Sequence, residues 1–380
     1  MRMKSKSITG KTADDIKARL LESASDGFAP TLAIVFLTPK EQVDGVRAVL
    51  SENDIQIFGA TVTDEFTEDG VESEAIAVLL LDMHSDYFKI YCLDINENNA
   101  EETARQIATD AVDTFSNPAF IVSGSHVTSP GHAILAGLVD VVGPDTTIIG
   151  GLASNDVLDE GGIIFTNTHS STTSMICLVI DQTKVALSGV AVSGWKPMGT
   201  LKTITKSEGN RVYTIDNEPA LDLLVKYTGI EVDLNDKSDI FTQIGSTIPL
   251  QVQKEHGSPV MNPPMMFNAH DRSIVFGMII EQGSQVRFSL PPDFEVIDNV
   301  IESGKKIRDD VPDADAMIIF SCIGRLNAFG PMMKTENNGL QELWNVPMAG
   351  FFSFGEFGKT PGGKPEFHGT TCSWVVLKEK

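Results

Sequence analysis

Residues 315–322 read DAMIIFSC and residues 347–356 read PMAGFFSFGE, with a segment of helical pattern between them. Each stretch is a short apolar run of the kind that forms a buried β-strand, and the second run carries glycines at its end. The same strand–helix–strand unit occurs at residues 31–60 and again at residues 118–156. A further apolar strand follows each copy, at residues 75–81, 173–180 and 371–377. Such repetition places equivalent residues at equivalent positions in space.

The connections between these strands decide the fold class. A strand–helix–strand crossover joins parallel strands, whereas the short connections after residues 81, 180 and 280 predict antiparallel hairpins. We therefore predict an α/β (mixed α+β) protein with mixed parallel and antiparallel sheets flanked by helices, built from internally repeated β-α-β units in two related domains. We expect a capped helix within residues 1–29, an N-terminal domain over residues 30–229 and a C-terminal domain over residues 230–380.

Composition excludes several classes of protein. The 380 residues carry a formal net charge of -23, which repels nucleic acids and anionic membrane surfaces. No apolar run approaches the roughly 20 residues of a transmembrane helix, and no apolar segment follows the basic N-terminus as in a signal peptide. The four cysteines form no CxxC pair, which is typical of a reducing compartment. We expect a cytoplasmic protein that binds neither nucleic acid nor membrane.

The strand over residues 315–322 leads into the sequence FSCIGR at residues 320–325. Gly324 allows a sharp turn, so Arg325 would lie at a helix N-terminus, where its guanidinium could hold a ligand carboxylate in a bidentate pair. The thiol of Cys322 at the same place would have a lowered pKa and could act as a nucleophile. The alternative is a buried structural cysteine beside a surface arginine.

Two equivalent strand-end loops combine small residues with an acid. Gly350 ends a strand and Glu356 follows at a turn, where its carboxylate could pair with a ligand amine or with Arg325. The corresponding loop of the preceding copy holds Ser154, Asn155 and Asp156. Ligands of α/β proteins bind at such strand ends, although the same residue types are also favoured in turns for local reasons.

Three further side chains could face a ligand. Trp195 and Lys196 lie in a turn flanked by glycines and a proline, which would either line a pocket or anchor the loop to the core. His368 would form a catalytic dyad with Cys322 if the fold brought the two within hydrogen-bond reach, and a partly buried histidine could instead ligate haem. The sequence has no phosphate-loop, GxGxxG, GxSxG or HExxH motif, so nucleotide-binding, hydrolase and zinc-protease functions lose their main support.

These segments resemble the FIST domain, a sensory module with an N-terminal and a C-terminal part. The resemblance extends over residues 31–376 and rests on the sequences at residues 150–156, 190–200, 204–224, 321–325, 349–356 and 367–371. It implies an intracellular signal-transduction protein that binds a small ligand, for which amino acids have been suggested. It also implies output through kinase, chemoreceptor or cyclic-nucleotide domains, and some relatives are thought to bind haem and sense nitric oxide.

We therefore expect a sensor that signals in trans to a separate partner, such as a histidine kinase or a chemoreceptor. The ligand, an amino acid or a derivative, would lie in a cleft of strand-end loops, with Arg325 on its carboxylate, Glu356 on its amine or on the arginine, and Trp195 closing the pocket. The other expected ligand-binding residues are Cys322, Gly350, Ser154, Asn155, Asp156, Lys196 and His368. We expect no catalytic residue, metal or cofactor. The alternatives are a haem-binding nitric oxide sensor, a cysteine-dependent enzyme built on Cys322 and His368, and a scaffold without a ligand.

Overall fold

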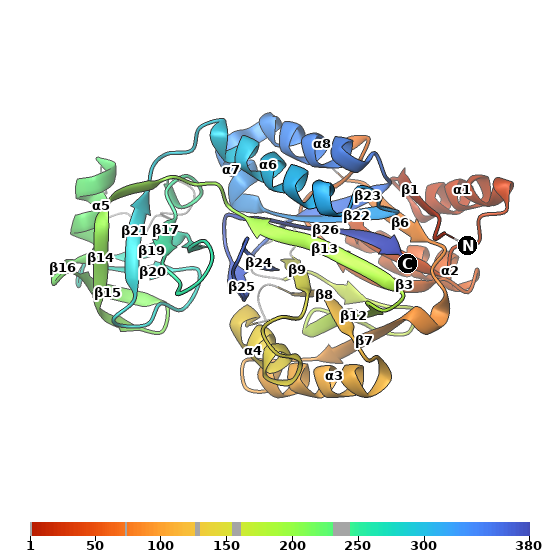
Figure 1. Ribbon diagram of the computed structural model, residues 1–380, viewed down its shortest axis with the longest axis horizontal. Coiled ribbons are helices and arrows are strands. Elements are labelled where there is room, and N and C mark those ends of the chain that lie inside the picture. Colours follow the sequence, from red (N-terminus) through yellow and green to blue (C-terminus); the bar gives the residue numbers. More distant parts are fainter. Residues whose placement is uncertain (1, 73, 126–129, 154–160, 231–243) are drawn as a thin grey trace.

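The computed structural model describes residues 2–72, 74–125, 130–153, 161–230 and 244–380. Two lobes lie side by side, a large layered lobe with helices on its outer faces and a smaller β-rich lobe (Figure 1). The connections over residues 193–196 and 290–294 join the smaller lobe to the larger one. Among the described residues, no helix is long and apolar enough to cross a membrane.

The N-terminal part of the chain forms a mixed six-stranded sheet. Its order is β1 (Ser5–Gly10), β6 (Ile76–Leu81), β2 (Leu32–Leu37), β3 (Gln56–Thr61), β10 (Ile164–Phe165) and β11 (Ser170–Ser171). The crossover helix α2 (Val43–Ser51) makes β2 and β3 parallel, and the other pairs are antiparallel. Helix α1 (Ala13–Ser23) begins after Thr12, which forms a reciprocal capping box with Asp15.

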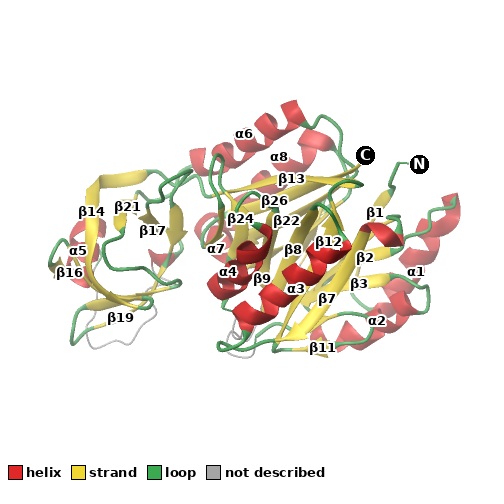
Figure 2. Cartoon of the chain, turned by 60° about the horizontal axis from the view of Figure 1, so that its bottom comes forward, coloured by secondary structure: helices red, strands yellow, loops and turns green. Residues whose placement is uncertain are grey.

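The second repeat forms another six-stranded sheet. Its order is β25 (Pro365–His368), β24 (Glu356–Lys359), β9 (Ile148–Ala153), β8 (Pro118–Ser125), β12 (Ser174–Asp181) and β7 (Phe88–Asp94). Only β8 and β9 pair in parallel among the described strands of this sheet. Helices α3 (Ala100–Thr114) and α4 (Gly131–Val142) lie next to each other outside this sheet, as Figure 2 shows. Gly137 permits this approach, because an added Cβ there would lie 2.1 Å from the carbonyl oxygen of Glu101.

The third sheet joins segments that are distant in the sequence. Its order is β13 (Val185–Val192), β26 (Cys372–Glu379), β22 (Ala316–Cys322), β23 (Met348–Ser353), β4 (Glu65–Thr67) and β5 (Gly70–Glu72). The parallel pair β22–β23 is the third repeat. The helices of this part are α6 (Glu295–Asp310), α7 (Ile323–Phe329) and α8 (Met333–Trp344), of which α6 packs against α8.

The large lobe has a core that all three repeats share. The equivalent strands β2, β8 and β22 are buried along their whole length, as their continuous apolar runs predict. Alternate residues of these strands meet in one cluster, in which the ring centroid of Phe351 lies 4.7 Å from that of Phe36 and 5.4 Å from that of Phe320. The predicted fold class is confirmed, with mixed sheets, flanking helices and repeated β-α-β units. The hairpins predicted after residues 81, 180 and 280 do not form, because β6 and β7, and likewise β12 and β13, belong to different sheets, and β20 and β21 are not neighbours in theirs.

The smaller lobe is an antiparallel sheet around its own apolar core. Its order is β18 (Val260–Asn262), β17 (Leu250–Val252), β21 (Gln285–Ser289), β14 (Pro197–Glu208), β15 (Arg211–Ile215), β20 (Ser273–Phe276) and β19 (Pro264–Asn268), with β16 (Glu218–Pro219) beside β15. Helix α5 (Ala220–Thr228) packs on this sheet and ends at Gly229, which has φ 69°. The predicted domain boundary falls at this cap and stays a prediction. Short 3-10 helices cover Ala24–Asp26, Lys40–Gln42, Ser85–Tyr87 and Gly330–Met332.

Candidate functional site

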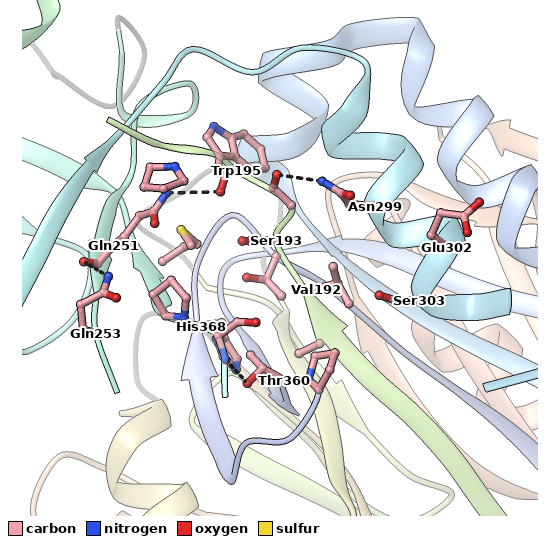
Figure 3. A pocket seen from close by; sticks show the side chains of 18 of the residues that line it. Val192, Ser193, Trp195, Gln251, Gln253, Asn299, Glu302, Ser303, Thr360 and His368 are labelled. Atoms are coloured by element: carbon pink, nitrogen blue, oxygen red, sulfur yellow. Dashed lines mark hydrogen bonds between the residues drawn. The ribbon is translucent and has the colours of Figure 1, made fainter. Parts of the chain in front are cut away.

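A cleft of about 410 Å³ lies where the two lobes meet (Figure 3). The large lobe contributes the end of β13, the connection that follows it, one face of α6 and the segment around β24 and β25. The small lobe contributes β17, β18 and β21. A concave site between two lobes, lined by a few polar groups, is the usual place for a small ligand. The cleft is therefore the candidate ligand site.

The large-lobe wall is a polar stripe on α6. Asn299, Glu302, Ser303 and Lys306 line the cleft and follow the spacing i, i+3, i+4 and i+7, so they share one face of the helix. The side-chain amide of Asn299 donates to the carbonyl oxygen of Gly194, 3.3 Å away. Glu302 pairs with Lys305 on the same helix. The ammonium of Lys306 has no ion-pair partner among the described residues, so it leaves positive charge at the rim.

The small-lobe wall places Arg287 opposite Gln251 in the ladder between β21 and β17. Gln251 is buried, and its amide donates to the carbonyl oxygen of Trp195 at 3.3 Å and to Oγ of Ser289 at 3.1 Å. Arg287 is half-buried, and its Nε is buried without a hydrogen-bond partner in the described part of the chain. That part also offers its guanidinium no acidic partner. Arg287 is thus a cation that is available on the cleft wall.

His368, at the end of β25, lines the cleft on the large-lobe side (Figure 3). Its ring is 1% exposed, and Nε2 lies 3.1 Å from the carbonyl oxygen of Gly358. Because a carbonyl oxygen only accepts, Nε2 carries the proton and Nδ1 is a bare acceptor, which has no partner among the described groups. Burial lowers the pKa of His368 to about 4 against the opposing effect of the Gly358 bond, so the ring is neutral at pH 7.

Trp195 and Lys196 lie in the connection between the lobes but have different surroundings. Trp195 is 5% exposed, lines the cleft, and donates from Nε1 to the carbonyl oxygen of Thr247 at 2.8 Å. Lys196 lies at the surface, where Nζ is 2.8 Å from Asp293 and 2.7 Å from Glu295. The structure therefore brings the tryptophan to the cleft and fixes the lysine on the segment that leads into α6.

Arg325 lies behind the cleft rather than in it. Its side chain is fully buried and forms a two-pronged pair with Glu336 of α8, with Nε 3.1 Å from Oε1 and Nη2 bonded to Oε2. Nη1 donates to the carbonyl oxygens of Ser193, at 2.6 Å, and Thr370, at 3.3 Å. Burial opposes the charged form, but the neighbouring Glu336 carboxylate outweighs it and raises the pKa of Arg325. The guanidinium that the sequence assigned to a ligand carboxylate is occupied by the protein itself.

A second, mostly apolar cavity of about 200 Å³ also has His368 in its wall, together with Met265, Met278 and Cys322. Burial, reinforced by the neighbouring Glu356, raises the pKa of the Cys322 thiol well above its usual value. The hydrogen bond of His368 goes to Gly358. The fold thus brings Cys322 and His368 to one cavity, with a protonated thiol that interacts with Glu356.

Glu356 is fully buried behind this cavity. Its carboxyl group accepts from Ser353 Oγ at 2.6 Å, from the Gly355 amide at 3.2 Å and from the Thr371 amide at 3.3 Å. Burial raises the pKa of Glu356 to about 8 against these hydrogen bonds, so the carboxyl group is largely protonated at pH 7. Its contacts are therefore with the loop around it rather than with Arg325, whose acid is Glu336.

The remaining sequence candidates fall into two groups. Gly350 lies inside β23, where an added Cβ would be 2.4 Å from the Phe66 ring and 2.5 Å from the Ile319 carbonyl oxygen, so its role is close strand packing. Ser154, Asn155 and Asp156 lie outside the described residues. The described residues contain no group of three or more His, Cys, Asp or Glu side chains able to hold a metal ion.

The cleft includes residues that the sequence did not single out. Arg287 alternates with Val286 and Phe288, which are buried in the small-lobe core, so strand periodicity could have placed it on the opposite face. The polar stripe of α6 could likewise have been found from its helical spacing in the sequence. Neither the strand alternation nor the helical spacing indicates which surface faces another lobe, because that depends on how the lobes pack.

Comparisons with known proteins identify the chain's family. The FIST N domain matches residues 31–218 and the FIST C domain matches residues 220–359. No curated protein matches the chain. A solved structure of a cyanuric acid hydrolase from A. caulinodans aligns with 100% of this chain and 99% of its own chain, at 7% sequence identity and a TM-score of 0.36. This similarity is too low to carry an argument. FIST domains are sensory domains of signal transduction that bind small ligands. Since the two domains together span most of its length, the chain belongs to the FIST family.

Proposed function

We propose that this protein senses a small polar ligand, an amino acid or a derivative of one, in the cleft between its lobes and signals to a separate partner protein. The observation that carries this proposal is the cleft itself, a volume of about 410 Å³ with polar walls from both lobes. A ligand that contacts both walls favours the lobe arrangement in which both contacts form. Binding therefore shifts the relative position of the lobes.

The contacts around Trp195 support a route from the cleft to the surface of the large lobe. Ser193, Gly194 and Trp195 line the cleft, and Arg325 donates to the carbonyl oxygen of Ser193 at 2.6 Å. The Arg325 guanidinium also lies 5.1 Å from the centroid of the Trp195 ring. Through Glu336 the same guanidinium is joined to α8. Movement of this connection would therefore shift Arg325 and, through Glu336, helices α7 and α8. A kinase or chemoreceptor partner bound at these helices could detect that shift.

Thermal denaturation with a panel of amino acids, their derivatives and haem tests the proposal. A ligand that binds only the folded state adds about 2.7 kcal/mol at a hundredfold excess over its Kd. The panel is run on the wild type and on Ser303→Trp, whose indole would fill the cleft from α6. Arg308→Trp, at an exposed position on the same helix outside the cleft, is the matched control.

We expect a selective rise in melting temperature that Ser303→Trp abolishes and Arg308→Trp retains. The absence of any shift across the panel, or an equal shift in the cleft-filling variant, would contradict the proposal. A Soret band on addition of haem, together with no response to amino acids, would instead support the haem-sensor alternative.

A further inference from the structure

Two buried polar atoms of residues that line the cleft have no hydrogen-bond partner in the described part of the chain. Among the described residues that line the cleft, they are Nε of Arg287 and Nδ1 of His368. Unsatisfied buried polar atoms are costly, and folded proteins retain few of them. Here one is a cationic donor from the small lobe and the other is an acceptor from the large lobe. A ligand that satisfies both atoms would bridge the two lobes.

The setting of Arg287 favours an anionic partner. Its neighbours Val286 and Phe288 are 0% and 2% exposed in the small-lobe core, which turns the guanidinium to the other face of β21. Arg211 of the same lobe, in contrast, has Asp271 at 3.5 Å. A planar guanidinium without an acid matches the two oxygens of a carboxylate. The second cation of the cleft, Lys306, adds positive potential from the opposite wall.

The setting of His368 favours a hydrogen-bond donor. Its Nε2–H is used by the carbonyl oxygen of Gly358, which fixes the tautomer and leaves Nδ1 as a lone-pair acceptor. The depressed pKa of His368 keeps the ring neutral at pH 7, so Nδ1 can accept from an ammonium, amide or hydroxyl group. A carboxylate could not satisfy this atom, because it has no proton to donate.

We infer that the ligand carries a carboxylate that binds Arg287 and an N–H or O–H donor that binds Nδ1 of His368. This inference rests on the proposed function, because it assigns chemistry to the same cleft. An α-amino acid, or a derivative that keeps the carboxylate and one N–H, has both groups. The two contacts come from different lobes, so a compound with only one of the groups stabilises the closed arrangement less.

Both atoms lie beneath the surface of the cleft, each with under 1 Å² accessible. A ligand therefore reaches them only if the lobes or these side chains adjust as it binds. That adjustment couples recognition of the two ligand groups to the change in lobe position on which the proposed signalling depends. Compounds with both groups should bind and signal, whereas compounds with one group should do both weakly.

The test measures stabilisation of the full chain by three probe sets. These are the twenty protein amino acids as free acids, the same compounds as carboxamides, and the corresponding acids without the α-amino group. We expect one or more free acids to stabilise the wild type. The deaminated forms of these acids should bind at least about tenfold more weakly, and the amides should not bind. Arg287→Gln should weaken binding of the free acid roughly 10- to 100-fold, and Arg287→Lys should retain part of it.

Matched variants separate recognition from folding. Arg211→Gln removes the same charge from the same lobe outside the cleft and should bind as the wild type does. His368→Asn keeps an acceptor near the position of Nδ1 and should still distinguish amino acids from deaminated acids. His368→Phe should lose that distinction, and if it fails to fold, the Arg287 variants still decide the matter. Circular dichroism of each variant checks that the fold is retained.

The outcomes distinguish this inference from the proposed function. A response to the free acids that Ser303→Trp abolishes but Arg287→Gln leaves unchanged would overturn the inference and leave the cleft as the ligand site. Equal stabilisation by acids and amides would do the same. No response to any probe in the three sets would overturn both.

Discussion

The buried pair between Arg325 and Glu336 allows a sharp prediction for Arg325→Met. The substitution removes a guanidinium with 0% exposure and leaves the equally buried Glu336 carboxylate without its partner. It also removes the donors to the carbonyl oxygens of Ser193 and Thr370. Removing one partner of a buried ion pair costs about 3–5 kcal/mol, because the remaining charge is uncompensated. We expect a loss of this size in the stability of the large lobe.

Urea denaturation followed by circular dichroism and tryptophan fluorescence measures this loss. The double variant Arg325→Met/Glu336→Leu replaces both charges with apolar groups and should recover most of the stability, since such replacements are often neutral or stabilising. Arg308→Met, at an exposed position on α6, should change stability by no more than about 0.5 kcal/mol. A loss below about 1 kcal/mol for Arg325→Met, or a double variant less stable than the single one, would refute the reasoning.

Three further predictions concern residues near the apolar cavity and the third sheet. The folded-state pKa of Glu356, about 8, lies above its usual 4.5, so the stability that its protonated form contributes is complete below about pH 4.5 and is lost as the pH rises through 8. Glu356→Gln should therefore reduce the fall in stability between pH 5 and pH 9 by up to several kcal/mol. A variant whose stability depends on pH as the wild type's does would contradict this prediction. The thiol of Cys322 should resist iodoacetamide at pH 7.5 until the protein unfolds, and fast native labelling read by mass spectrometry would restore the enzyme alternative. Gly350→Ala should destabilise by about 1–3 kcal/mol because its Cβ meets the Phe66 ring and the Ile319 carbonyl oxygen, and a melting temperature equal to that of the wild type would contradict this.

The sequence predicted the repeated units well because their signal is local. The continuous apolar runs at β2, β8 and β22 indicate strands buried on both faces, and the intervening helical patterns indicate parallel crossovers. Pairings between distant strands leave no such local signal. The contacts of β13 with β26 and of β4 with β23 depend on how the completed units pack.

The candidate site shows the same division between local and tertiary information. The FSCIGR turn correctly suggested that Arg325 follows a buried strand at the start of a helix. Its acid is Glu336, eleven residues later on another helix, so the sequence alone offered no reason to prefer an internal pair over a ligand. Arg287, in contrast, looked like an ordinary polar residue in an alternating strand. Its significance arises only because that face of β21 lines the cleft between the lobes.

The position of β26 in the third sheet has a consequence for synthesis of the protein. This strand, Cys372–Glu379, lies between β13 and β22, so the sheet cannot close until the ribosome has released residues more than 175 positions after β13. The small lobe, from Pro197 to Ser289, is continuous in sequence and has no such dependence. The small lobe can therefore fold while the large lobe is still incomplete and has exposed strand edges. Nascent chains with exposed strand edges are prone to aggregate and to bind chaperones.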